Sequence, residues 1–147
     1  MKRLLSAALA VIAAAACSST SLPDRGGDDP RLEFTSAADP RDYLFPTPRA
    51  TVQHLAGGVS VSTMMTHPEG CRDFDAELNE SGDRLEVSVA ITPTRTLMVC
   101  RGGPANYTYT ARLRDLARGD YTLVVRHVYP NGDRPNVVVL ETEITVD

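Results

Sequence analysis

Three cysteines are the side chains of this 147-residue chain best suited to covalent chemistry: Cys17, Cys71 and Cys100. The sequence has no C-x-x-C spacing, and no cluster of histidines accompanies the later two cysteines, which disfavours a metal site. In an exported protein, an odd number of cysteines leaves one thiol outside the disulfide framework. One of the three cysteines therefore needs a role of its own.

The three histidines of the chain do not form a metal-ligating or catalytic set. His54 and His67 fall in or beside expected loops, so we expect both to face solvent. His127 shares a strand face with apolar residues, which places it at the margin of the core. No H-x-H or H-E-x-x-H spacing is present, and the sequence therefore predicts no metal site.

An acidic row is the other candidate for chemistry. Asp73, Asp75 and Glu77 alternate along one expected strand, which spaces their carboxylates about 7 Å apart on one face. Such a row could hold Ca²⁺, but no D-x-D-x-D-G loop completes the six to eight oxygen ligands. We expect a solvated face instead, paired across the sheet with Arg112 and Arg114. No G-x-S-x-G nucleophile motif is present either, so the sequence predicts neither an enzyme nor a cofactor.

Composition and charge disfavour a nucleic-acid partner. The chain has no tryptophan, aromatic residues make up 5% of it, and its formal net charge is -4. Few side chains can therefore stack on bases, and the charge repels a polyanion.

The first seventeen residues decide where we expect the protein to reside. Lys2 and Arg3 precede a largely apolar run, residues 4–16, which has the length of a signal-peptide core and is too short to span a bilayer. Three alanines then lead into Cys17. This pattern resembles the bacterial lipoprotein signal, although Ala14 stands where leucine is most common in that family. The resemblance implies that residues 1–16 are removed and that Cys17 carries the lipid; ordinary cleavage after Ala16 is the alternative.

Lipidation of Cys17 would leave an even number of cysteines for a disulfide. Export places Cys71 and Cys100 in an oxidising compartment, so we expect them to be bridged; two buried thiols or a metal pair are the alternatives. Lipid with several acyl chains would hold the protein stably on a membrane. Ser18 resembles an outer-membrane address in Gram-negative lipoproteins. In other envelopes we expect the outer face of the cytoplasmic membrane.

Residues 17–48 read as a lipidated N-terminus followed by a flexible tether. They are rich in Pro, Gly, Ser and Asp, a composition that buries too little apolar surface to order itself. Its later apolar residues could still dock on the domain or be bound by a partner. These are Leu32, Phe34, Tyr43, Leu44 and Phe45.

Residues 50–147 show the period-two alternation of half-buried strands. Runs of alternating apolar and polar residues are separated by turn-forming segments rich in Gly, Pro, Asn and Asp. In the last run, Val138 and Leu140 are expected on the same, inward face. About seven strands in some 100 residues predict an all-β fold, an antiparallel two-sheet sandwich of the Ig-like type. The clearest runs are residues 59–64, 73–78, 84–91, 107–114 and 138–146.

Residues 116–125 resemble the L-x-x-G-x-Y signature of bacterial Ig-like and fibronectin-III-like domains. The resemblance implies that Leu116 fills the core, Gly119 supplies the turn, and the Tyr121 hydroxyl ties a tyrosine corner. It also explains Arg118-Gly119-Asp120 as part of a turn, although that tripeptide can bind integrins. The absence of the core tryptophan and the short Cys71–Cys100 spacing depart from antibody-type domains.

Together these features predict a non-catalytic, membrane-anchored envelope lipoprotein whose sandwich binds another protein or supports a neighbour. Its contact surfaces would be edge strands or loops, because loops on a rigid sandwich commonly carry recognition. The candidate loops are residues 68–71, 101–105 and 130–135. A module that binds a small ligand, an ion or a glycan is the alternative, as is an inhibitor or accessory domain of an enzyme.

Overall fold

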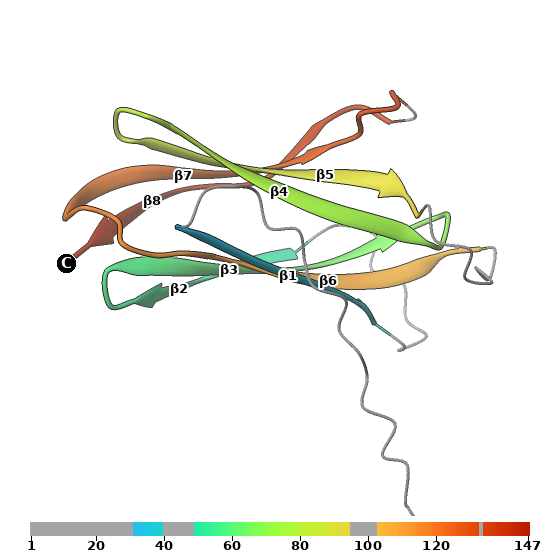
Figure 1. Cartoon of the computed structure of the whole chain (residues 1–147), viewed down its shortest axis with the longest axis horizontal. Coiled ribbons are helices and arrows are strands. Elements are labelled where there is room, and N and C mark those ends of the chain that lie inside the picture. Colours follow the sequence, from blue (N-terminus) through green and yellow to red (C-terminus); the bar gives the residue numbers. More distant parts are fainter. Residues whose placement is uncertain (1–30, 40–48, 95–102, 133) are drawn as a thin grey trace, which may run out of the picture.

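The computed structural model describes residues 31–39, 49–94, 103–132 and 134–147 of the chain. These residues form two stacked four-stranded sheets, a β-sandwich (Figure 1). One sheet has the order β1-β6-β3-β2 and the other the order β4-β5-β7-β8. The strands are β1 (Leu32–Asp39), β2 (Arg49–Leu55), β3 (Gly58–His67), β4 (Arg72–Ser81), β5 (Arg84–Pro93), β6 (Ala105–Leu113), β7 (Gly119–Val128) and β8 (Val137–Val146).

The all-β, two-sheet sandwich predicted from alternation is confirmed, with two differences in detail. It has eight strands rather than about seven, and β5 and β7 are parallel neighbours, whereas we expected antiparallel pairing throughout. The parallel pair follows from the path of the chain. After β5 the chain crosses to the other sheet, runs back along it as β6, and returns as β7 in the direction of β5.

The additional strand, β1, corrects the expected boundary of the tether. Leu32 and Phe34 are buried in the core, and β1 pairs along its whole length with β6. Period-two alternation explains this, because the neighbouring Glu33 and Thr35 are exposed. The ordered domain thus begins by residue 31, within the segment expected to be a flexible tether. Docking on the domain, which the sequence left open, is confirmed for Leu32 and Phe34, whereas Tyr43, Leu44 and Phe45 lie outside the described residues.

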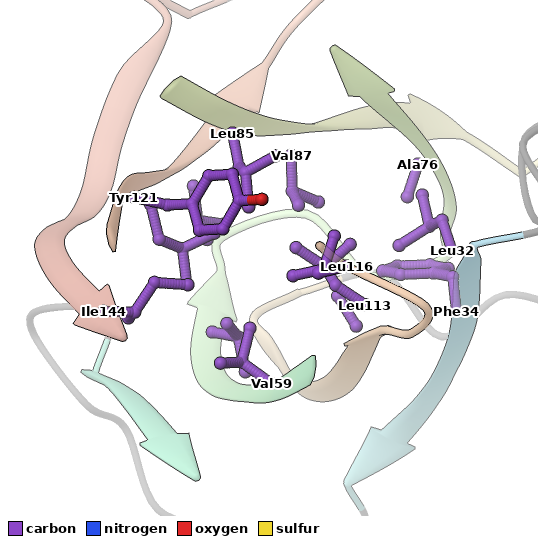
Figure 2. Close-up of a cluster of buried hydrophobic side chains, with 14 of the residues drawn as sticks. Leu32, Phe34, Val59, Ala76, Leu85, Val87, Leu113, Leu116, Tyr121 and Ile144 are labelled. Carbon is purple, nitrogen blue, oxygen red and sulfur yellow. The ribbon is translucent and has the colours of Figure 1, made fainter. Parts of the chain in front are cut away.

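The core forms where the inward faces of the two sheets meet. Figure 2 shows side chains from both sheets, among them Phe34 and Leu113 from one and Leu85 and Val87 from the other. Strand β5 illustrates the rule, because its buried and half-buried residues alternate along nearly its whole length. No helix in the described part of the chain has the length and apolarity needed for a membrane span.

The tyrosine corner lies between β6 and β7. The Tyr121 hydroxyl donates a hydrogen bond of 2.9 Å to the carbonyl of Ala117, four residues upstream. Leu116 is buried in the core cluster, and Gly119 begins β7 with a φ of +157°, a conformation that L side chains rarely adopt. These contacts define the end of the sandwich that we call the corner end, where the β2–β3 and β4–β5 turns also lie (Figure 1).

Replacing Tyr121 by phenylalanine should lower the free energy of unfolding by about 1–2 kcal/mol. The ring would still fill its site, but the Ala117 carbonyl would lose its partner. Urea unfolding of the two proteins measures the difference. Tyr121→Leu is the control, because it should cost more by removing ring contacts as well.

Candidate functional site

Several connections leave from the end of the sandwich opposite the tyrosine corner, which we call the loop end, and three of them carry loops singled out in the sequence. The connections β3–β4, β5–β6 and β7–β8 all leave from it, because His67 pairs with Ala105, and His127 with Val137. All three contain the loops expected to carry recognition, although residues 101, 102 and 133 lie outside the described residues. The fold therefore brings segments far apart in sequence to one surface.

The β7–β8 connection projects away from the two layers of the sandwich at the loop end (Figure 1). The Asn136 side chain accepts a hydrogen bond of 3.0 Å from the Tyr129 amide, and the Gly132 amide donates one of 2.9 Å to the Tyr129 carbonyl. Two prolines, Pro130 and Pro135, restrict its backbone further. The described residues of this connection after Tyr129 are exposed, so it presents an ordered, solvent-facing loop.

Two apolar side chains are exposed where this connection enters β8. Val137 is 44% exposed and Val138 is 40% exposed, the two highest values among the large hydrophobic residues that the structure describes. A β-bulge on β8, opposite Val125 and Arg126 of β7, leaves Val139 without a partner in the register, so Val138 pairs with Arg126 rather than continuing the inward face of Leu140. The expectation that Val138 points inward is therefore wrong, because one extra residue reverses the alternation.

The β3–β4 connection is anchored by buried polar groups. Contrary to expectation His67 is buried, because it ends β3 on the inward face of its sheet. Its Nδ1 atom lies 3.1 Å from the amide of Glu69, and burial lowers the pKa of the ring. The Arg72 guanidinium is buried and ion-pairs with the exposed Glu69, while the Arg72 amide donates a hydrogen bond of 3.1 Å to the Tyr107 hydroxyl.

A second cluster of buried side chains lies inside the sandwich next to the loop end. It contains Met65, Ile91, Tyr107 and Tyr129, and Tyr129 lies 6.3 Å from the ring of His67, centre to centre. This cluster packs the β3–β4 and β7–β8 connections against the sandwich. These two connections are thus held by packing rather than loosely attached.

His127 lies on the inward face of β7 and is buried, deeper than the core margin expected for it. The Tyr109 hydroxyl and the His127 Nε2 atom share a hydrogen bond of 2.8 Å. Burial lowers the pKa of His127 to about 4 and raises that of Tyr109. Both side chains are therefore neutral at pH 7, and they pack in the interior of the sandwich. His54, by contrast, is exposed as expected.

Acid should destabilise the protein through His127. Between pH 6.5 and about 4 the unfolded chain binds a proton at this residue and the folded chain does not, so stability falls as the pH falls. The loss should approach about 3 kcal/mol at pH 4. Urea unfolding at pH 7, 5.5 and 4 measures it. His127→Gln is the control and should show a flatter profile; identical profiles would contradict the assignment.

The outer face of the β1-β6-β3-β2 sheet carries a shallow hollow of about 450 Å³. Thr35, Thr110, Ser62 and Thr51 are in register across its four strands, and the hydroxyls of Ser62 and Thr110 lie 3.2 Å apart. Such a surface offers hydroxyl hydrogen bonds, with the exposed Arg49 at its margin. The hollow is lined by Arg49, Thr51, Ser62, Thr63, Met64, Thr108, Tyr109 and Thr110.

The acidic row of β4 is exposed, as expected, at Asp73, Asp75 and Glu77. Its predicted pairing with Arg112 and Arg114 is wrong, because those arginines lie on and just beyond β6 in the other sheet. There they ion-pair with Glu33 of β1, at 3.7 and 2.5 Å. Among the described residues, no group of three or more His, Cys, Asp or Glu side chains is arranged to hold a metal ion.

The cysteines are only partly covered by the structure. Cys71 precedes β4 with a φ of +64°, and its carbonyl accepts a hydrogen bond of 2.8 Å from the amide of Thr94. Cys17 and Cys100 lie outside the described residues, so the lipid site and the Cys71–Cys100 pairing stay predictions.

Comparison with known proteins gives one match. A family model described as the ORF11 beta-sandwich domain matches residues 61–141, which is more than half of the chain and runs from β3 into β8. No curated protein and no solved structure matches the chain. The matched span includes the three connections of the loop end.

Proposed function

The chain belongs to the ORF11 beta-sandwich domain family, and from this premise we propose that it is a non-catalytic, lipid-anchored envelope protein that binds another protein at its loop end. The observation that carries the proposal is the projecting β7–β8 connection with Val137 and Val138 exposed at its base. Exposed apolar side chains beside a rigid polar loop are typical of interaction sites, where a buried apolar centre is surrounded by a polar rim.

The direction of the N-terminus supports this arrangement. The Arg31 carbonyl accepts a hydrogen bond of 2.9 Å from the Arg114 amide, so the chain enters the domain at the corner end. A lipid on Cys17 would be joined to that end by residues 18–30, whose reach is at most about 45 Å. The corner end would then lie nearer the membrane and the loop end farther from it. In a Gram-negative envelope we propose the outer membrane, and otherwise the outer face of the cytoplasmic membrane.

A Cys71–Cys100 disulfide belongs to the same proposal. Cys71 lies in the β3–β4 connection, and Cys100 stands in sequence between β5 and β6, whose connection leaves the same end. A bridge would fasten two connections of the loop end together. We expect Cys71→Ser to yield one titratable thiol in the unreduced, denatured protein, at Cys100. The native mature protein should yield none, and an equal thiol count in the two proteins would contradict the pairing.

Photo-crosslinking in intact cells tests partner binding. A photoreactive amino acid at Asn131, which is exposed in the projecting connection, should give one reproducible crosslinked product. Adding Val137→Lys and Val138→Lys should reduce that product at least tenfold, because charges would replace the apolar surface. Leu55→Lys is the matched control, since Leu55 is 37% exposed at the corner end and should not affect crosslinking. An undiminished product in the double variant would contradict the proposal.

The hollow on the β1-β6-β3-β2 sheet favours one second candidate, a module that binds a small hydroxyl-bearing or anionic ligand. Its volume of about 450 Å³ lies within the usual range of ligand pockets. A saturable rise in melting temperature with a sugar or carboxylate panel would support it. Ser62→Val should remove that rise, because the valine offers no hydroxyl.

A further inference from the structure

We propose that the open edge of β8 accepts an extended peptide of the partner protein as a further strand, and that the preferred peptide alternates apolar and basic residues. The inference rests on the proposed protein-binding function and names the chemistry of the partner. It starts from the position of β8 at the end of the order β4-β5-β7-β8, with no strand beyond it among the described residues. An edge strand has unpaired amides and carbonyls that a peptide can use.

The two edges of this sheet differ in how well they are protected. On β4, the other edge, the Asp75 carboxylate accepts a hydrogen bond of 3.0 Å from the Ala76 amide, so that donor is already occupied. The first four residues of β8 are instead Val-Val-Val-Leu, and Val137 and Val138 are the exposed ones. Strand addition is therefore favoured at β8.

The side chains of β8 define what an added strand should carry. On the outer face, Glu141 pairs with Val124 of β7 and Glu143 with Thr122, and both glutamates are exposed. Residues of an added strand on that face would lie about 5 Å from them, where opposite charge is favoured and like charge is not. On the inner face the neighbours would be Leu140 and the buried Ile144, which favour apolar residues. Alternation of basic with apolar residues satisfies both faces.

A second copy of the chain is a poorer occupant of this edge. In an antiparallel pair of β8 strands, the register that pairs Leu140 with Val146 places Glu143 opposite Glu143 of the other copy, and a shift of two residues places Glu141 opposite Glu143. Like charges directly opposite each other destabilise a sheet. The charge pattern of β8 thus selects against self-pairing and for a basic partner segment.

Peptide binding to the full chain in detergent tests the inference. The probes are two ten-residue peptides with blocked ends, one alternating valine and lysine and the other alternating valine and glutamate. We expect the lysine peptide to bind at least tenfold more tightly, and the amide NMR signals of residues 137–146 to shift most. The double variant Glu141→Lys/Glu143→Lys should reverse the preference between the two peptides.

Asp75→Lys/Glu77→Lys on β4 is the matched control, because it changes the net charge equally at the other edge and should leave the preference intact. Equal binding of both peptides, an equal effect of the β4 variant, or self-association through β8 would each overturn the inference. Cellular crosslinking separates it from the proposed function. Partner capture without any peptide preference would refute strand addition alone, whereas peptide preference without partner capture would refute the proposed function.

Discussion

Alanine in place of Gly58 is expected to lower the free energy of unfolding by about 4 kcal/mol or more. Gly58 begins β3, and a Cβ atom there would lie 2.0 Å from the backbone oxygen of Leu113. A backbone oxygen cannot rotate away as a flexible side chain can, so β3 and β6 would have to separate at their first pair, Val59 with Leu113. Native domains have a free energy of unfolding of only about 5–15 kcal/mol, so adding this methyl group would remove a large part of the stability.

Gly57→Ala provides the matched control for this prediction. Gly57 has a φ of +69°, but nothing lies within 4 Å of its added Cβ atom. Alanine there should lower the free energy of unfolding only by the conformational cost of the left-handed region, about 1–2 kcal/mol. Urea unfolding of both variants should thus rank Gly58→Ala well below Gly57→Ala. Equal stabilities would show that β3 and β6 do not approach each other as closely as described.

Removing the Leu123 side chain should cost about 4 kcal/mol, the second large effect. Leu123 has no exposed surface and lies in register with Leu85 on β5 and Thr142 on β8. Alanine would lose buried apolar area and leave a cavity between the two sheets. Thermal and urea unfolding of Leu123→Ala measure the loss.

Val138→Ala is the control within the same sheet. Its side chain is 40% exposed on the outer face, so the expected change is within about 0.5 kcal/mol. A similar loss for Leu123→Ala and Val138→Ala would contradict the position of the core. The comparison also separates stability from recognition, because Val138 is proposed to act in binding.

Alternation in the sequence was sufficient to predict the faces of the regular strands. Leu85, Val87, Val89 and Ile91 alternate with polar or small residues, and all four are buried. Such strands have one solvent-exposed face and one apolar face, and the apolar faces of the two sheets pack against each other. The Leu116–Tyr121 corner was predicted instead from its resemblance to the L-x-x-G-x-Y signature, and the structure contains its hydroxyl bond to Ala117.

Features that depend on tertiary context could not be predicted in this way. Strand β1 lies in a segment whose overall composition resembles a tether, and only its pairing with β6 makes Leu32 and Phe34 part of the core. His67 was expected in solvent because turn residues follow it, yet it keeps the inward register of β3. The parallel pairing of β5 with β7 depends on the crossover path rather than on any local pattern.

The candidate site was predictable as a set of loops but not as a surface. The three loops were identified by their turn-forming residues, whereas their meeting at one end follows from the strand order. The exposure of Val138 depends on the bulge beside Arg126, which has no signal in the alternation of β8. Sequence thus supplied the components of the loop end, and topology supplied their arrangement.

Mass spectrometry of the mature protein from its native membrane tests the central claim most directly, because the orientation of the loop end depends on a lipid at Cys17. We predict a chain that begins at Cys17 and carries the added mass of a diacylglyceryl group, with or without an N-acyl chain. A mature chain that begins at another residue, or an unmodified Cys17, would contradict the account.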